Sequence, residues 1–301
     1  MVSIPMTHRG PDDGGNYQVQ WQNGFLDVSF VTDIGKKREH NEDSCLMCAP
    51  DSDELVANRG LVFAVADGMG GASAGELASH LALETMLEQF YKPEQGTIPA
   101  RMIQSIEDAN LHIFQHAEEH PEYYGMGTTL SALVIHGDNA YIGQVGDSRI
   151  YLQRSNEPLK QLTEDHSLVA EQVRNGIISE EEAQQHTLRN LITRAVGIKP
   201  VVEVDLFSLK IKKGDRLLIC SDGLCGQIDN DEIEQKMVHD PPLENAQALL
   251  QAALDSGGAD NITIAVVQVV DSLESLPLQS GGEEIETPPE GFFQKLKNLF
   301  G

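Results

Sequence analysis

Residues 61–71 read LVFAVADGMGG: six apolar residues, then the carboxylate Asp67, then three glycines in four positions. Six consecutive apolar residues are typical of a strand that is buried on both faces. A carboxylate at the end of such a strand lies at the edge of a hydrophobic core, so it usually has a cation or a charged partner. The glycines let backbone approach that partner, and a bare carbonyl can itself be a ligand. Taken alone, the stretch also fits an ordinary strand followed by a glycine-rich turn.

The same arrangement, an acidic residue at one end of an apolar run, recurs along the chain. The acidic corners are Asn41-Glu42-Asp43, Asp67-Gly68, Gly146-Asp147-Ser148, Asp222-Gly223 and Asp260-Asn261. If these strands pack into one core, the carboxylates come together and repel one another unless cations neutralise them. Oxygen-only ligands favour a hard divalent cation such as magnesium or manganese. The sequence therefore predicts a metal centre at the strand ends.

Six motifs follow one another along the chain: TDIGKKREHNED at 32–43, VADGMGG at 65–71, GTT at 127–129, VGDSR at 145–149, SDGL at 221–224 and DNIT at 260–263. In this order, over about residues 28–270, they resemble the motifs of the metal-dependent type-2C Ser/Thr protein phosphatases, the PPM family, in its bacterial form. Six ordered motifs are far more specific than one. The resemblance implies an α+β fold, a four-layer αββα sandwich with two antiparallel sheets flanked by helices.

The resemblance also assigns metal ligands. Asp67 matches the residue shared by two Mn²⁺ or Mg²⁺ ions. Asp43, Asp222 and Asp260 match carboxylates that bind one ion directly or through water, and the carbonyl of Gly68 matches an additional ligand. The expected cofactor is therefore a pair of divalent cations, which would activate water for attack on a phosphate monoester.

Further residues have weaker or more conditional assignments. Arg38, five residues before Asp43, matches the phosphate-binding arginine of the family, and its planar guanidinium suits bidentate phosphate binding. Asp147 matches a residue that in bacterial members helps to hold a weaker third ion. Asp33 and Glu42 would accept hydrogen bonds from metal-bound water, although roles in a turn and at a strand edge fit them equally well.

The sequence departs from the animal members of the family at Met69, where those members carry a histidine proposed as general acid. Protonation of the leaving group would then come from metal-bound water or from another histidine, or be unnecessary for activated esters. His40 is the nearest histidine in sequence and is the simplest candidate.

Composition excludes several classes of protein. With 47 Asp and Glu against 21 Lys and Arg, the formal charge of −26 makes an unaided nucleic-acid surface improbable. No apolar run is long enough to span a bilayer, and residues 1–24 lack the apolar middle of a signal peptide, so we expect a cytoplasmic protein. Cys45 and Cys48 have the spacing of a redox or zinc pair but fall in an expected strand, so we predict buried thiols.

Residues 1–26 are polar and turn-rich, which predicts a flexible leader before a phosphatase domain over 27–270. Within this domain we expect a polar loop over 50–60. Apolar residues at helical spacing predict helices over about 77–90 and 99–113.

Residues 163–199 form a polar insertion that is too long for a plain connection between strands. In the family the corresponding stretch is a flap beside the active site that influences substrate choice, so we predict that it governs protein substrates and not the chemistry. His166, His186 and Arg194 lie in it, and we expect each to be a solvated surface residue unless it lies over the metals.

The end of the chain lies beyond the resemblance. Residues 271–290 contain six acidic residues and neither Lys nor Arg, which predicts an extended acidic linker. Residues 291–301 predict a short amphipathic helix, whose apolar face would comprise Phe292, Phe293, Leu296, Leu299 and Phe300. It would dock on a partner protein or back onto the core, and with only two lysines a stable membrane anchor is the weakest option.

The leading prediction is an Mn/Mg-dependent phosphatase that hydrolyses phosphoserine and phosphothreonine in phosphorylated proteins, in one step, with metal-activated water. A small-molecule phosphatase with the same site is one alternative. A catalytically inactive, PPM-like regulatory binding module is another. It would require lost ligands, and all five principal ligand positions are retained.

Overall fold

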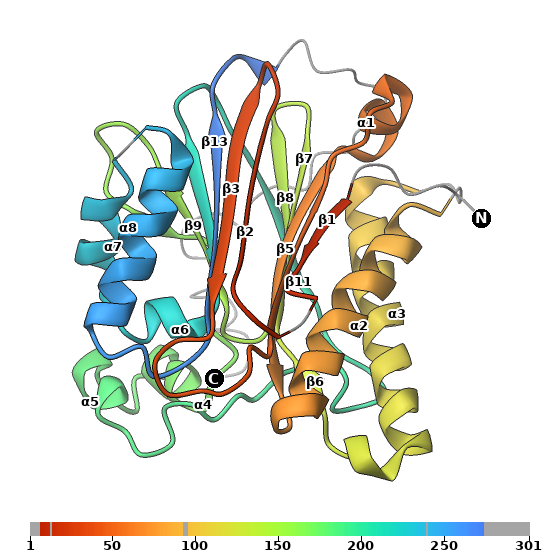
Figure 1. The fold of residues 1–301 in the computed structure, drawn as a ribbon, viewed down its shortest axis with the longest axis vertical. Coiled ribbons are helices and arrows are strands. Elements are labelled where there is room, and N and C mark those ends of the chain that lie inside the picture. The colour runs from red at the N-terminus through yellow and green to blue at the C-terminus, as the bar shows by residue number, and fades with distance from the viewer. Residues whose placement is uncertain (1–6, 13, 93–95, 239, 274–301) are drawn as a thin grey trace.

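Two antiparallel sheets packed face to face make up the centre of the molecule, and helices cover their outer faces (Figure 1). The computed structural model describes residues 7–12, 14–92, 96–238 and 240–273. Within this part of the chain, the arrangement confirms the predicted four-layer αββα sandwich.

The first sheet has the order β1-β4-β5-β7-β8-β11, with β6 paired to β5. Its strands are β1 (Thr7–Gly10), β4 (Asp43–Cys48), β5 (Leu61–Met69), β6 (Gly127–Thr128), β7 (Leu130–His136), β8 (Asn139–Val145) and β11 (Asp205–Lys210). The helices α2 (Ala72–Phe90) and α3 (Ile98–Glu119) cover its outer face. Both helices were predicted from the spacing of apolar residues.

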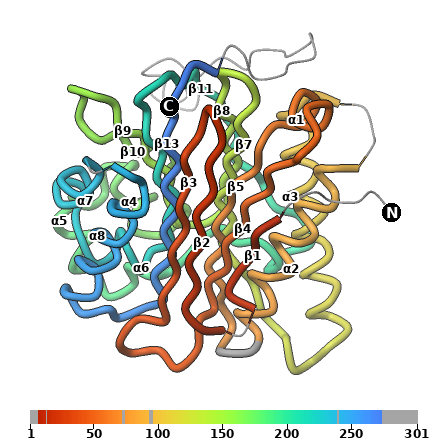
Figure 2. Tube along the Cα trace, turned by 45° about the horizontal axis from the view of Figure 1, so that its top comes forward, coloured from red at the N-terminus to blue at the C-terminus, as the bar shows by residue number. Residues whose placement is uncertain are grey.

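The second sheet has the order β10-β9-β12-β13-β3-β2. Its strands are β2 (Tyr17–Gln22), β3 (Leu26–Asp33), β9 (Arg149–Gln153), β10 (Lys160–Gln161), β12 (Arg216–Cys220) and β13 (Ile262–Val269). On its outer side lie α6 (Asp222–Cys225), α7 (Asn230–Lys236) and α8 (Pro242–Asp255). Figure 2 shows β3 and β5, one from each sheet, running through the middle of the sandwich.

The apolar run before Asp67 is buried on both faces because β5 lies between two hydrophobic layers. Phe63 and Val65 belong to the cluster between the sheets, whereas Val62 and Ala64 belong to the cluster under α2 and α3. The two faces alternate, as the period of a strand requires.

Cys45 and Cys48 lie three residues apart on β4, and therefore on opposite faces. Cys45 packs between the sheets and Cys48 packs under the helices. Both are free and buried, which confirms the prediction of core thiols.

The prediction of a loose leader over residues 1–26 is wrong for its described residues. β1 pairs with β4, and β2 pairs with β3, so this part of the chain supplies an edge strand to each sheet. In β2, Tyr17, Val19 and Trp21 alternate with glutamines and pack against the cluster between the sheets. This period-two pattern is the signal that the turn-rich composition concealed.

The prediction of a plain loop over residues 50–60 is also wrong. Asp53–Arg59 form the helix α1, whose first turn is capped by the Ser52 side chain, which accepts a hydrogen bond from the Leu55 amide. A helix of seven residues has too few apolar positions to give a clear period, so its cap is the more informative signal.

The insertion over 163–199 contains two short helices, α4 (Leu168–Arg174) and α5 (Glu180–Gln184). At the other end of the domain, Leu273 is buried in the cluster between the sheets, so the packed core continues beyond Val270. The rest of the predicted acidic linker, and the amphipathic segment, lie outside the described residues. Within the described residues, no helix has the length and apolar character needed to cross a bilayer.

Candidate active site

A cleft of about 290 Å³ opens beside the acidic ends of the strands. This is several times the roughly 30 Å³ that one water occupies in the liquid, so a phosphoryl group and its counter-ions would have room. It is lined by Arg38, Glu42, Asp67, Gly68, Met69, Gly70, Gly71, Asn190, Ile192, Asp222 and Asp260. Asp43 and Asp147, buried to 2% and 7% exposure, do not line it.

Strand register brings the first two carboxylates together. Asp43 and Asp67 are direct partners across the antiparallel β4–β5 pair, so their Cα atoms lie side by side. The Asp67 amide donates to Thr129 Oγ1 at 2.9 Å, and its carbonyl accepts from the Thr129 amide and from Thr128 Oγ1. The GTT motif, quoted above only for its resemblance, therefore fixes the backbone of Asp67.

The second sheet delivers the other carboxylates. Asp222 opens α6 directly after β12, and the preceding Ser221 donates through Oγ to Asp43 Oδ2 at 2.7 Å. A Cβ added to Gly223 would lie 1.8 Å from the carbonyl oxygen of Asn261. Glycine at this position thus permits the close approach of the corners that hold Asp222 and Asp260.

Burial and mutual repulsion raise the pKa values of these carboxyls. Burial, followed by the neighbouring Asp222 and Asp260, raises the pKa of Asp43 to about 7, and burial with Asp222 and Asp165 raises the pKa of Asp147 to about 8. The pKa of Asp222 rises to about 6, first through burial and then through Asp260, and burial lifts the pKa of Asp67 well above its usual value. The uncompensated negative charge is what a bound cation would neutralise.

The residues fit a pair of hard divalent cations. All the predicted donors are oxygens, and two buried carboxylate oxygens, Asp43 Oδ1 and Asp147 Oδ1, have no hydrogen-bond partner among the described residues. In that part of the chain no three acidic, histidine or cysteine side chains already form a metal cage. Ligation would therefore also use backbone carbonyls and water, as the resemblance implies for Gly68.

The raised pKa values predict how the stability of the metal-free protein depends on pH. Asp43 and Asp147 hold protons in the folded state that they release when the chain unfolds. The stability contributed by these protonated carboxyls is present below about pH 4 and is lost as the pH rises to about 8.

We therefore expect the melting temperature in the presence of a chelator to fall between about pH 5 and pH 8, and manganese to restore it most strongly at the upper end. Thermal unfolding followed by fluorescence measures this. The fall should be shallower for Asp147→Asn, which has one titrating carboxyl fewer. Equal slopes for the two proteins would contradict the assignment.

Arg38, the candidate phosphate-binding residue, lines the cleft. Its Nη2 lies 2.7 Å from Asp260 Oδ2 and its Nη1 lies 4.0 Å from Glu42 Oε1. The side chain is 46% exposed, so solvent and ligands can reach the guanidinium. The Arg38–Asp260 pair places the candidate phosphate-binding group directly beside a candidate metal ligand.

The two remaining acidic candidates, Glu42 and Asp33, differ in their position relative to the cleft. Glu42 lines the cleft, whereas Asp33 does not. Asp33 accepts hydrogen bonds from the Gly35 amide and the Asn16 side chain, which supports its alternative role in a turn.

His40 is exposed and outside the cleft lining, and no histidine is among the described residues that line it. Met69 does line it. The site thus gives no support to His40 as the general acid.

The insertion contributes residues that the sequence did not single out. Asn190 and Ile192 line the cleft. His166, expected at the surface, is only 3% exposed and bonds to Gly146 and Asp205, so the prediction of a solvated residue is wrong for it. The polar sequence around His166 gave no sign of burial, because its partners lie elsewhere in the chain: Gly146 in the turn between β8 and β9, and Asp205 on β11.

Comparison with known proteins gives the same family. The family model of protein phosphatase 2C matches residues 35–259. The serine/threonine phosphatase stp of Listeria monocytogenes is 39% identical over 249 residues, which cover 81% of this chain and 96% of that protein. The protein phosphatase PhpP of Streptococcus pneumoniae is 35% identical, over 81% of this chain and 98% of its own length.

Comparison with solved structures gives the same family. The Mycobacterium tuberculosis serine/threonine phosphatase PstP/Ppp superposes with a TM-score of 0.73 at 35% identity, covering 82% of this chain and 99% of that one. The catalytic domain of PstP in complex with two manganese ions superposes with a TM-score of 0.71 at the same identity and coverage. This chain therefore belongs to the protein phosphatase 2C family, the PPM family of the resemblance, and is a bacterial-type protein-serine/threonine phosphatase.

Proposed function

We propose that the chain hydrolyses phosphoserine and phosphothreonine in proteins in one step, at a site that holds two Mn²⁺ or Mg²⁺ ions. Asp67 would be shared between the ions, and Asp43, Asp222, Asp260 and the Gly68 carbonyl would complete the protein ligands. Two such cations, when bound, supply an acidified water for attack and positive charge for the phosphoryl oxygens. The manganese in the PstP structure supports this choice of cofactor.

The observation that carries the proposal is that the buried, mutually repelling carboxylates lie next to the accessible side chain of Arg38. The acidic cluster by itself would repel a phosphate dianion. Arg38 would exchange its bond with Asp260 for bidentate hydrogen bonds to two phosphoryl oxygens, which orients the phosphorus toward the acidic ends of the strands. We propose that Asp147, buried beside Asp222, helps to hold a weaker third ion.

Comparison of substrates tests the proposed function against the small-molecule alternative. Initial rates with manganese would be measured on a phosphothreonine peptide and on small metabolite phosphomonoesters. We expect the higher kcat/KM on the peptide. A higher kcat/KM on a metabolite ester would favour the alternative reading, and no hydrolysis of any ester would favour a binding module.

Replacing Arg38 by alanine is expected to lower kcat/KM on the phosphopeptide about tenfold to a hundredfold, mainly through a higher KM. This is the range for losing hydrogen bonds to a charged group. Manganese affinity, measured by calorimetry, should not fall, because the substitution removes a cation that competes for Asp260.

Lys37→Ala is the matched control, since it removes the neighbouring exposed charge, which does not line the cleft. It should leave kcat/KM within about twofold of the natural protein. A loss of manganese affinity in Arg38→Ala would instead assign Arg38 to the support of the metal site.

We further propose that residues 291–301 recruit a partner protein through the predicted amphipathic helix, with residues 274–290 as the tether. Because Leu273 is buried in the core, the informative truncation ends after Leu273. It should leave activity on a small chromogenic ester and the melting temperature unchanged, but abolish co-purification of a partner. A large fall in melting temperature would show that the segment docks on its own domain.

A further inference from the structure

The cleft has one wall whose role the chemistry above does not explain. Asn190 and Ile192, from the insertion, line the same cleft as Arg38 and three of the candidate metal-binding carboxylates, Asp67, Asp222 and Asp260. Asn190 is exposed, and its amide forms no hydrogen bond with another described residue. A neutral group that both donates and accepts hydrogen bonds is therefore free at the mouth of an otherwise charged cleft.

Backbone hydrogen bonds hold this wall in place. The Leu168 amide donates to the Leu191 carbonyl at 2.9 Å, and the Thr193 amide donates to the His166 carbonyl at 2.7 Å. Farther along, Val196 and Thr128 exchange two backbone hydrogen bonds of 2.9 and 3.0 Å. Since Thr128 Oγ1 also bonds the Asp67 carbonyl, Asn190 is tied to the strand that carries the central carboxylate.

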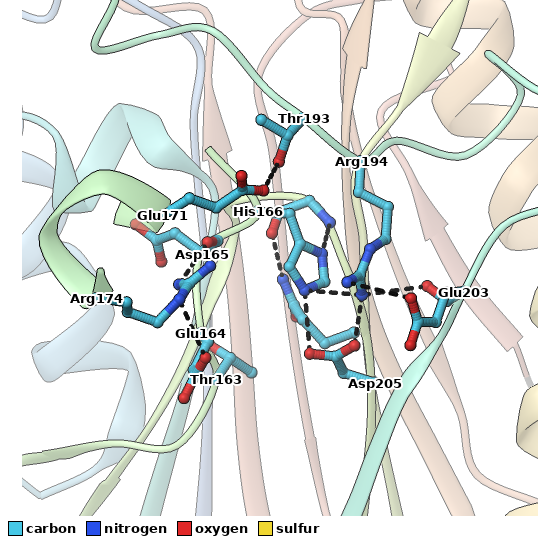
Figure 3. A network of polar contacts seen from close by, with 12 residues as sticks. Thr163, Glu164, Asp165, His166, Glu171, Arg174, Thr193, Arg194, Glu203 and Asp205 are labelled. Atoms are coloured by element: carbon cyan, nitrogen blue, oxygen red, sulfur yellow. Dashed lines mark hydrogen bonds and ion pairs between the residues drawn. The ribbon is translucent and has the colours of Figure 1, made fainter. Parts of the chain in front are cut away.

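A cluster of polar side chains around the buried His166 ring also holds this segment in place (Figure 3). His166 Nδ1 accepts from the Gly146 amide at 3.0 Å, so the ring proton lies on Nε2, which donates to Asp205 Oδ2 at 3.1 Å. Asp205 Oδ1 in turn pairs with Arg194, four residues beyond Asn190. The ring is almost fully buried, so water competes little for these bonds.

The remainder of the insertion is built differently. α5 has no buried side chain, and Ile177 and Leu188 are exposed. The insertion therefore has a packed start around His166, an exposed helical tip around α5 and a return segment, residues 190–196. Among its described residues, only Asn190 and Ile192 of the return segment line the cleft.

We propose that Asn190 is a specificity-determining residue, whose amide binds the main chain of the peptide that carries the phosphorylated residue, and that His166 is the positioning residue that fixes it there. This rests on the proposed function. A phosphopeptide presents backbone N–H and C=O groups next to its phosphate, and one carboxamide can pair with both. A small aryl phosphate presents neither.

Asn190→Ala tests the proposal directly. We expect kcat/KM on a phosphothreonine peptide to fall about threefold to tenfold, the range for one neutral hydrogen bond, while kcat/KM on p-nitrophenyl phosphate stays unchanged. Thr187→Ala, an exposed site in the same insertion that does not line the cleft, should change neither rate.

The outcomes separate the two claims. Equal losses on both substrates, or no loss on the peptide, would overturn the role of Asn190 and leave the proposed function standing. A natural protein that is inactive on the peptide would overturn the proposed function, and the role of Asn190 with it.

Double mutants that combine changes at His166 or Asp205 with Asn190→Ala test whether His166 positions Asn190. His166→Asn keeps an acceptor near Nδ1 for the Gly146 amide but loses the donor to Asp205, and Asp205→Asn disturbs the same cluster from the other side. Either change should reduce peptide activity, and adding Asn190→Ala should then cost much less than it does alone. Full additivity in both backgrounds would overturn the positioning role.

Discussion

Asp67→Asn is expected to lower kcat on a phosphothreonine peptide by about three orders of magnitude and to raise the melting temperature of the metal-free protein. Loss of hydration, followed by the negative charges of Asp43, Asp222, Asp147 and Asp260, raises the pKa of the Asp67 carboxyl. A neutral amide relieves that repulsion but bridges two cations poorly. Activity and stability should therefore move in opposite directions, which a mutation that merely damages the fold cannot produce.

Steady-state kinetics at saturating manganese and thermal unfolding in a chelator measure the two effects. Asp222→Asn should behave in the same way, because its carboxyl lines the same cleft and loss of hydration raises its pKa to about 6. Asp108→Asn, which changes a carboxylate on α3 that accepts from Gln104, should alter neither quantity. Near-natural activity of Asp67→Asn would remove it from the metal site.

Gly68→Ala is expected to lower activity about a hundredfold for a different reason, and to destabilise the protein. An added Cβ would lie 2.1 Å from the Gly75 carbonyl oxygen and 2.6 Å from the Glu42 carbonyl oxygen, both of them backbone atoms. Either β5 or the first turn of α2 must move. Overpacking of this kind costs about 1–3 kcal/mol of unfolding free energy, and a displacement of about 1 Å at a reacting centre can cost about a hundredfold in rate.

Chemical denaturation and peptide kinetics test this prediction. Gly24→Ala is the matched control, because a Cβ there meets no atom within 4 Å. If Gly68→Ala retained both its stability and its manganese-dependent activity, the close packing around the strand end would not be needed to present the Gly68 carbonyl.

Local pattern was enough to predict individual strands and helices of the core, whereas their arrangement in a four-layer sandwich was predicted from the family resemblance. The unbroken apolar run of β5 and the helical spacing in α2 and α3 depend only on neighbours in sequence. The edge strand β2 was missed because the turn-rich composition around it concealed its period-two alternation, and α1 was missed because so short a helix shows hardly any period. In each case burial against a distant element decided the outcome.

For the candidate site, too, some residues could be predicted from the sequence and others could not. The carboxylates could be predicted because each follows or precedes an apolar strand within a recognisable motif. The residues that position these carboxylates and the cleft wall could not be predicted. Ser221 bonds Asp43 across 178 residues of sequence, and His166 reaches Gly146 and Asp205 on either side. Asn190 lines the cleft because the return segment pairs with Ser167 and Thr128, and a single sequence does not reveal that pairing.

The central claim is that the acidic strand ends hold divalent cations that the reaction requires. Its most direct test is the initial rate of phosphate release from a phosphothreonine peptide, with metal-stripped protein, as manganese is titrated. The account predicts negligible release without metal, a rise to saturation with manganese, and full loss when excess chelator is added. Undiminished release by the stripped protein in the presence of chelator would contradict it.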